Sequence, residues 1–409
     1  MTFEAGVRRD PPDERPLPES DPVLVEKLRA EIAAGPMTFA RFMKVALTEP
    51  GHGYYATATD RPTRSGDFLT APELHPIFGA VVGRTLDEAW RTLGRPDPFH
   101  LVEYGAGTGA LAEAVLRGLE ADRSGLRVAL RYEPVEVSAV HLELIRDRLS
   151  KAGFGDAITA VPAGPADPRP PRTGAIVANE FLDALPVHRV EVTGGELREL
   201  FVTWDDASGR FTEVAGEPST PALAERLVTE GIVLAEGARA EIGLEVGPWL
   251  EDATTRIERG YAVVIDYGRR AAELYGPDRA GGTLRAYSGQ RAHDDPFVAI
   301  GRQDLTAHVD FSAVEREAGE RGWRTIGLTT QAHYLLGAGL EELLRARQAD
   351  PGLDAPAYLA LRAAVMRLLD PRALGNFRVL VLDRGVPADA RLGGVTGPGD
   401  ADPTPSGPP

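Results

Sequence analysis

The chain has 409 residues, of which 43% are hydrophobic, so it is long enough for one large domain or two with a substantial core. Its formal net charge of −16 argues against a nucleic-acid partner, which would need basic patches, but is compatible with a basic protein substrate. The absence of cysteine excludes disulfides, thiolate metal sites and cysteine nucleophiles, and the eight histidines show no H-x-x-x-H spacing, so we expect no metal.

No stretch has the character of a transmembrane span or of a signal-peptide core. The first ten residues include Glu4 and Asp10, whereas a mitochondrial presequence is poor in acids. We therefore expect a cytoplasmic location. The composition makes no prediction about the oligomeric state.

The N-terminal part of the chain is predicted to be a tail followed by helices. Residues 1–19 are polar and proline-rich, which is typical of disorder. Two loops, residues 50–55 and 66–73, carry charged, hydroxyl and aromatic side chains and are candidates for a lid over a ligand. The helices expected here run from a cap at Ser20 or Asp21 to Ala34, from Thr38 to just before Pro50, and onward from Pro76.

The stretch from residue 99 to residue 120 predicts a nucleotide-type site. Residues 99–102 form a brief apolar run that reads as a strand buried on both faces, and the apolar spacing over 110–120 is helical. Glycines let the backbone approach a ligand, and a helix N-terminus offers free N–H groups and a partial positive charge. The residues between strand and helix that carry this prediction are Glu103, Gly105, Gly107 and Gly109.

The spacing of these residues favours S-adenosylmethionine over a dinucleotide. A dinucleotide fingerprint is G-x-G-x-x-G, whereas this turn reads E-x-G-x-G-x-G and is one residue tighter. The carboxylate of Glu103 would repel a pyrophosphate but could hold the amine of S-adenosylmethionine, whose sulfonium is also cationic. The alternative is an ordinary strand-to-helix turn.

A second acidic residue strengthens this interpretation. Residues 126–133 read as the next strand, which ends in Glu133, 24 residues past Gly109. A carboxylate there could accept hydrogen bonds from both ribose hydroxyls, worth roughly 1.5–3 kcal/mol each. The alternative is a solvated charge at a strand end.

The rest of the chain predicts a parallel α/β sheet with an insertion. Repeated β-α units imply a parallel sheet with helices on both faces. Apolar runs on either side of Gly194-Gly195 predict an antiparallel hairpin within an inserted subdomain over about 187–240. The further helices predicted are residues 135–149, 221–230, 249–257, 311–321, 332–347 and 355–369; the further strands are 157–161, 174–178, 261–266, 283–287, 324–328 and 377–382. The organisation expected is a disordered tail over 1–19, a helical or lid region over 20–98, a cofactor-binding core over 99–384 and a disordered tail over 385–409.

Asn179, Glu180 and Asp183 follow the strand over 174–178 and are candidate catalytic residues. Ligands of an open parallel sheet bind outside the carboxyl ends of the strands, where the strand order reverses, so these residues should share one crevice with Glu103. The amide of Asn179 can orient a nitrogen, and a carboxylate can bind a guanidinium, localise its charge and help to remove its proton. The alternative is a helix cap with acids in the first turn.

Three weaker candidates have structural alternatives of equal or greater weight. Asp266, at the end of a strand, could reach the pocket or form a turn. His308 with Asp310 could act as an acid–base pair, or His308 could be a structural histidine. His52, Tyr54 and Tyr55 could form an aromatic lid over the ligand, or they could pack in the core.

Several ordered motifs resemble the MidA-like methyltransferase family, and the likeness spans roughly residues 20 to 384. The motifs that carry it are GDFLTAPE at 66–73, the turn at 103–109, ANEFLDALP at 178–186, IDYG at 265–268, GTLRAY at 282–287, DLTAHVDF at 304–311 and TTQ at 329–331. The resemblance implies a Rossmann-like class I fold that uses S-adenosylmethionine and, in some members, symmetric dimethylation of protein arginine.

The resemblance also implies roles for individual residues. Glu103 and the three glycines would hold the methionine end of the cofactor and Glu133 its ribose, while Asn179, Glu180 and Asp183 would face the acceptor. The residues that would close over the cofactor or substrate are Gly66, Asp67, Thr70, Pro72 and Glu73.

We therefore expect an S-adenosylmethionine-dependent methyltransferase that acts on a nitrogen, plausibly in an arginine of a partner protein. In-line methyl transfer needs positioning and a desolvated cleft more than a strong base, which suits a chain without a Ser-His-Asp set. Two alternatives stay open: a small-molecule N- or O-methyltransferase of secondary metabolism, and a cofactor-binding assembly factor with little turnover.

Overall fold

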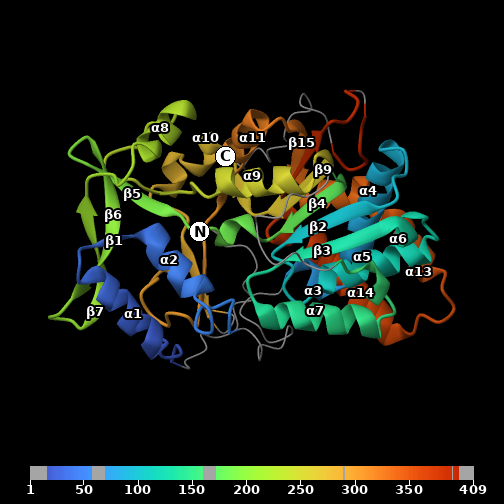
Figure 1. Cartoon of the computed structure of the whole chain (residues 1–409), viewed down its shortest axis with the longest axis horizontal. Coiled ribbons are helices and arrows are strands. Elements are labelled where there is room, and N and C mark those ends of the chain that lie inside the picture. Colours follow the sequence, from blue (N-terminus) through green and yellow to red (C-terminus); the bar gives the residue numbers. More distant parts are fainter. Residues whose placement is uncertain (1–15, 58–69, 160–171, 289–290, 389, 396–409) are drawn as a thin grey trace.

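A six-stranded sheet forms the centre of the larger of two lobes (Figure 1). The structure is a computed structural model that describes residues 16–57, 70–159, 172–288, 291–388 and 390–395. The strand order is β15-β16-β9-β4-β2-β3, in which the last four are parallel and β16 runs antiparallel to both of its neighbours. The bounds are β2 Phe99–Tyr104, β3 Leu130–Val135, β4 Thr173–Asn179, β9 Arg259–Asp266, β15 Arg324–Thr330 and β16 Arg378–Arg384.

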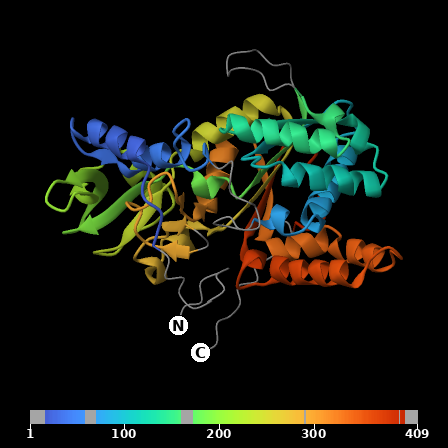
Figure 2. The same ribbon diagram turned by 90° about the horizontal axis from the view of Figure 1, so that it is seen from below.

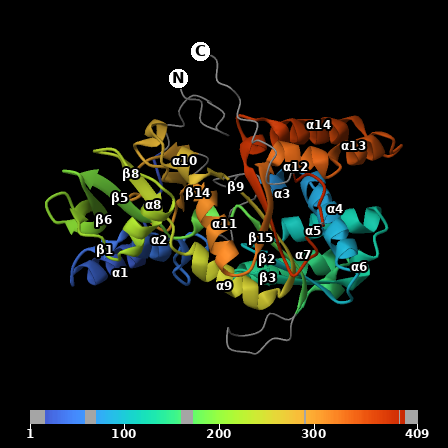
Figure 3. The same cartoon turned by 90° about the horizontal axis from the view of Figure 1, so that it is seen from above.

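Helices cover both faces of this sheet, which explains why its strands are almost continuously apolar. Side chains alternate across a strand, so Leu101 packs with the helices of one face and Val102 with those of the other. Figures 2 and 3 show α12–α14 together on one side of this lobe. The first face packs against α4 Ile77–Thr92, α5 Ala110–Ala121, α7 Ala139–Lys151, α12 Gln331–Gly337, α13 Leu340–Gln348 and α14 Ala355–Leu369; the second packs against α9 Val246–Arg256 and α11 Phe311–Glu320.

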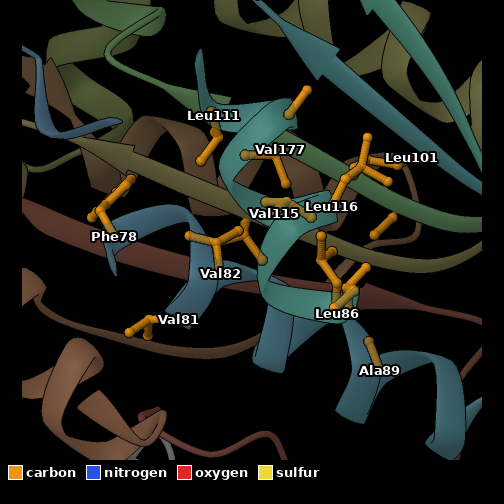
Figure 4. Packing of buried hydrophobic residues seen from close by; sticks show 14 of the residues in the cluster. Phe78, Val81, Val82, Leu86, Ala89, Leu101, Leu111, Val115, Leu116 and Val177 are labelled. Atoms are coloured by element: carbon orange, nitrogen blue, oxygen red, sulfur yellow. The ribbon is translucent and has the colours of Figure 1, made fainter. Parts of the chain in front are cut away.

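The tightest packing on the first face joins α4 and α5 to the sheet (Figure 4). Phe78 and Val82 of α4 belong to the same hydrophobic cluster as Val115 and Leu116 of α5, and all four side chains are buried. This layer fixes α5, and therefore the glycine turn before it, against the carboxyl end of β2.

The smaller lobe is built from three segments that are far apart in the sequence. Its main sheet has the order β1-β6-β5-β8 with β7 beside β6, and a second sheet has the order β12-β11-β13. Phe42, Val202 and Leu305, one from each segment, belong to one hydrophobic core. The elements are α1 Pro22–Ile32, β1 Met37–Thr38, α2 Phe39–Thr48, β5 His188–Thr193, β6 Glu196–Asp205, β7 Arg210–Gly216, α8 Ala222–Thr229, β8 Arg239–Ile242, β11 Arg285–Ser288, β12 Arg291–His293 and β13 Asp304–Thr306.

The α/β fold class and the main element predictions are confirmed. Asp21 caps α1 with Pro22 in the first turn, and Thr38 caps α2. Residues 194–195 connect the antiparallel strands β5 and β6 as a hairpin. What the periodicity did not show is that this hairpin, the N-terminal helices and β11–β13 share one core.

Several predicted boundaries are wrong. The strand expected over 126–133 begins with the helical turn α6 Leu126–Ala129, so β3 starts at Leu130 and runs to Val135. Ser138 caps α7, which delays that helix beyond the predicted start at residue 135. In the described part of 157–161, Ala157 ends a 3-10 turn and Ile158 makes an isolated bridge to Tyr132.

The helix predicted over 332–347 is also interrupted. Gly339 adopts a φ of +95°, a left-handed conformation that glycine tolerates, and it separates α12 from α13.

Within the described residues, no helix is both long and apolar enough to cross a membrane.

The chain reverses its direction of travel across the sheet at β2, and this reversal positions the site. β2 pairs with β3 on one side and with β4 on the other. The connections that leave the carboxyl ends of β2 and β4 turn away from each other, which leaves a crevice between these two strand ends. The turns after β2, β3 and β4 all open into it.

Candidate active site

The turn between β2 and α5 has the backbone geometry that its glycines predicted. Gly105, Gly107 and Gly109 have φ values of +66°, +51° and +76°. Such left-handed conformations are costly for residues with a Cβ. A Cβ built on Gly107 would meet a single neighbouring atom within 4 Å, the carbonyl oxygen of Gly105 at 3.9 Å, so this turn leaves open space for a ligand.

A cavity of about 650 Å³ lies at these strand ends, which is within the size range of cofactor and ligand sites. It is lined by the glycine turn, the residues after β3 and β4, and parts of both lobes. The predicted site residues that line it are Thr70, Pro72, Glu73, Glu103, Gly105, Gly107, Asn179, Glu180 and Asp183. Gly109 closes the turn against Ile145, and Gly66 and Asp67 lie outside the described residues.

Glu103 is the last residue but one of β2, just before the glycine turn. Its Oε2 accepts a hydrogen bond of 2.6 Å from the hydroxyl of Tyr132, and its side chain is buried. Burial raises the pKa of Glu103 to about 7, the hydroxyl of Tyr132 lowers it, and the charge of Glu136 raises it further. A cationic ligand group near Glu103 would offset this cost.

The prediction that Glu133 binds a ribose is not supported by its position. Its carboxylate is 1% exposed, pairs with Arg172 and Arg256, and does not line the cavity. The reason is the strand boundary: β3 continues to Val135, so the carboxylate that emerges at the end of the strand is Glu136.

Glu136 lines the cavity in the place expected for a ribose-binding acid. Its Oε2 accepts a hydrogen bond of 2.9 Å from the N–H of Gly107, and its Oε1 accepts one of 3.0 Å from the N–H of Ser138. Glu136 is therefore held between the glycine turn and the start of α7. Sequence reasoning missed it by three residues.

The turn after β4 brings together the three predicted catalytic residues. Glu180 adopts a φ of +51°, and its Oε1 accepts hydrogen bonds of 3.1 Å from the N–H of Ala71 and from the amide of Asn179. Three buried oxygens in this turn have no hydrogen-bond partner among the described residues. They are Asn179 Oδ1, Glu180 Oε2 and Asp183 Oδ1.

The alternative interpretation of these residues as a helix cap does not fit the geometry. The turn of 3-10 helix η3 Leu182–Ala184 is preceded by Phe181, and no side chain caps it from that position. The N–H groups of Phe181, Leu182 and Asp183 donate instead to Oδ2 of Asp266, at 2.9–3.3 Å. Asp266 is thus the turn former, and it does not line the cavity.

Burial makes the acids of this turn weak. Burial raises the pKa of Glu180 to about 8, and the negative charge of Asp183 adds to the shift. The pKa of Asp183 is well above its usual range because of burial and of the charges of Asp266 and Asp304. A cation placed among these groups would favour their ionised forms.

The segment Thr70–Glu73 covers another part of the cavity. Helix α3 Ala71–Leu74 begins here, fixed by the hydrogen bond from Ala71 to Glu180. Burial raises the pKa of Glu73 to about 7, although Arg148 and the hydroxyls of Thr70 and Thr108 lower it. This segment therefore connects the turn after β4 with the start of α5.

The weaker candidates differ in their position. His308 and Asp310 lie outside the cavity: His308 faces Arg279, and burial lowers its pKa to about 3, while Asp310 caps α11. His52 contacts Asp21 at the start of α1 and also lies outside the cavity, whereas Tyr54 and Tyr55, predicted together with it, line the cavity. Among the residues that the structure describes, no group of three or more His, Asp or Glu side chains is arranged to hold a metal ion.

Sequence reasoning also missed most of the aromatic lining. The rings of Tyr104, Phe181 and Trp249 pack against one another in tilted and T-shaped arrangements, with centroids 5.5–6.2 Å apart. Apolar and aromatic spacing in these segments is equally consistent with core packing, so no signal separated the two. The other cavity residues that were not predicted include Tyr267, Tyr287 and Asp304.

The fold and the site define a class of protein. An open sheet with an antiparallel last strand, a glycine turn after β2 and a carboxylate after β3 is the arrangement of a Rossmann-like enzyme that binds a nucleoside cofactor. The chain belongs to a family of S-adenosyl-L-methionine-dependent methyltransferases, whose model matches residues 81–329.

Two curated relatives are similar over most of the chain. The Drosophila melanogaster protein named protein arginine methyltransferase NDUFAF7 homolog, mitochondrial, is 33% identical over 353 residues, which cover 77% of this chain and 75% of the relative. The Homo sapiens protein named protein arginine methyltransferase NDUFAF7, mitochondrial, is 29% identical over 391 residues, which cover 89% of this chain and 83% of the relative. A crystal structure from Burkholderia thailandensis bound to S-adenosyl-homocysteine matches with a TM-score of 0.80 and 34% identity over 92% of this chain and 97% of that one.

The residues of the cavity fit S-adenosylmethionine, the cofactor of this family. The open space above Gly107 and the buried carboxyl of Glu103 suit the methionine end, and Glu136 suits the ribose. Glu103, Gly107 and Glu136 are therefore the residues that would hold the cofactor.

Replacement of Glu136 and of Glu133 by alanine should have opposite effects. Glu136→Ala should weaken the binding of S-adenosylhomocysteine about tenfold or more, because two charge-assisted hydrogen bonds are lost. Glu133→Ala should leave that affinity nearly unchanged but lower the unfolding free energy by about 3–5 kcal/mol, because Arg172 and Arg256, whose side chains are only 15% and 12% exposed, each lose an ion pair. Calorimetry measures the affinity for S-adenosylhomocysteine, and denaturant unfolding measures the stability. If Glu133→Ala loses affinity while Glu136→Ala keeps it, the assignment of the ribose to Glu136 is wrong.

Proposed function

We propose that this methyltransferase acts on a guanidinium nitrogen of an arginine in a partner protein. The observation that carries the proposal is a pair of buried oxygens, Glu180 Oε2 and Asp183 Oδ1, that have no hydrogen-bond partner within the described parts of the chain and lie in the cavity that also contains the glycine turn. Carboxylates bind guanidinium groups by charge-assisted hydrogen bonds. The names of the curated relatives, which describe protein arginine methyltransferases, support the same substrate.

The residues of the turn after β4 would orient the acceptor and receive its proton. The cofactor, when bound, supplies the methyl group. Glu180 and Asp183 would accept hydrogen bonds from the guanidinium and localise its charge away from the reacting nitrogen, while Asn179 Oδ1 fixes that nitrogen. The proton that the nitrogen releases would pass to Glu180, whose pKa of about 8 suits a group that takes up a proton near neutral pH.

The net charge of the protein suits a basic partner. The formal net charge of −16 favours a partner whose arginine lies in a basic segment.

We also propose a cytoplasmic location, although the fly and human relatives carry the word mitochondrial in their names. Separation of the cell into organelle and soluble fractions, followed by immunodetection, tests this point.

Labelling with a radioactive methyl group tests the proposed acceptor. The purified protein is added, with methyl-labelled S-adenosylmethionine, to a lysate from cells that lack it. Label should appear in protein and, after acid hydrolysis, in methylarginine. Label in small extractable products alone would instead show a small-molecule acceptor, and cofactor binding without any label would indicate an assembly factor.

The rate of methylarginine formation should depend on the ionisation of Glu180. Because burial raises the pKa of Glu180 to about 8, its carboxyl is largely neutral below that pH and accepts guanidinium hydrogen bonds poorly. At acceptor concentrations well below saturation, where the rate reports the protonation state of the free enzyme, the initial rate should therefore rise with pH through an inflection near 8. Glu180→Gln keeps an oxygen for the N–H of Ala71, so it should fold, but it should react slowly and show no such inflection. An unchanged profile in Glu180→Gln would exclude this role.

A further inference from the structure

A second acidic group faces the cavity from the smaller lobe. Asp304, the first residue of β13, and Tyr55, which follows α2, both line the cavity. The hydroxyl of Tyr55 donates a hydrogen bond of 2.7 Å to Oδ1 of Asp304, across 249 positions of sequence. The N-terminal region therefore orients a carboxylate that belongs to another segment.

Backbone contacts hold this carboxylate in register with the turn after β4. The N–H of Ala307, just beyond β13, donates a hydrogen bond of 2.9 Å to the carbonyl oxygen of Asp183. β13 also pairs with β11 in antiparallel fashion, and in this pair Asp304 lies directly opposite Tyr287. Directly opposed residues of such a pair place their side chains on the same face, so Tyr287 and Asp304 lie together.

The electrostatics of this cluster favour a positively charged ligand. Asp183 is 6% exposed, its Oδ1 has no partner among the described residues, and the charge of Asp304 helps to raise its pKa. Burial and the charge of Asp304 also raise the pKa of Tyr55 well above its usual range, so its hydroxyl remains a donor. A cation between Asp183 and Asp304 would remove their mutual repulsion.

The aromatic residues around the carboxylates suit a flat cation. Tyr55, Tyr267 and Tyr287 all line the cavity on this side. Tyrosine faces attract cations, and a guanidinium stacks on aromatic rings better than a compact ammonium does. Two carboxylates in a cavity that tyrosines also line would suit the planar fork of N–H donors that an arginine presents.

We propose that Asp304, oriented by Tyr55, is the residue that determines specificity for a guanidinium acceptor, which it holds together with Asp183. This inference rests on the proposed function and extends it. The larger lobe would then bind the cofactor, and the smaller lobe would choose the acceptor. Changes at Asp304 should accordingly alter acceptor recognition without altering the affinity for the cofactor.

A pair of matched peptides tests this division. The probes are Gly-Gly-Arg-Gly-Gly and the same peptide with citrulline, a neutral analogue of nearly the same shape, each titrated calorimetrically in the presence of S-adenosylhomocysteine. The unaltered protein should bind the arginine peptide about tenfold or more tightly than the citrulline peptide, as expected for charge-assisted hydrogen bonds.

The variants Asp304→Asn and Tyr55→Phe should lose most of this preference. Both should keep the unaltered affinity for S-adenosylhomocysteine, and Tyr55→Phe, a positioning variant, should retain more of the preference than Asp304→Asn. The matched control is Asp294→Asn, which removes the same charge from a side chain that is 83% exposed and outside the cavity. A variant that was merely misfolded would lose both peptides and the cofactor together.

The outcomes separate this inference from the proposed function. If the unaltered protein forms methylarginine in the lysate while Asp304→Asn keeps the full preference for arginine, the inference is wrong and the function stands. If no methylarginine forms but the preference for arginine depends on Asp304, the function is wrong and the recognition site stands. Equal binding of both peptides by the unaltered protein would overturn the inference.

Discussion

The arrangement of the active site depends on one buried carboxylate, that of Asp266. It is fully buried at the end of β9 and accepts hydrogen bonds from three successive N–H groups after Glu180, as well as from the N–H of Tyr267. Burial raises its pKa to about 8, while these donors lower it. The turn after β4 therefore needs no cap of its own, so Asn179, Glu180 and Asp183 can keep polar atoms directed at a ligand.

This turn is where the two lobes meet. On one side it adjoins the glycine turn and Glu136, which belong to the parallel sheet. On the other it adjoins β13, whose following residue Ala307 hydrogen-bonds to Asp183. The buried acids between the lobes repel one another, which adds to the effect of burial in raising their pKa values. A cationic ligand would lessen this repulsion.

The sequence predicted the parts of this site that depend on local chemistry. The glycine turn was recognisable because backbone conformations with positive φ require glycine, and the caps at Asp21 and Thr38 because their side chains bond nearby N–H groups. The sequence pattern points to Glu133 and not to Glu136, because an apolar run does not show where a strand ends. The pairing of Tyr55 with Asp304 could not be predicted, since it arises from tertiary packing between segments that no short-range pattern connects.

A crystal structure with bound S-adenosylhomocysteine would show how the ligand lies in the cavity. We expect the ribose hydroxyls on Glu136 and the sulfur facing Asn179 and Glu180, with open space beyond it bounded by Asp183 and Asp304. If the sulfur is directed away from these residues instead, the proposed site is wrong.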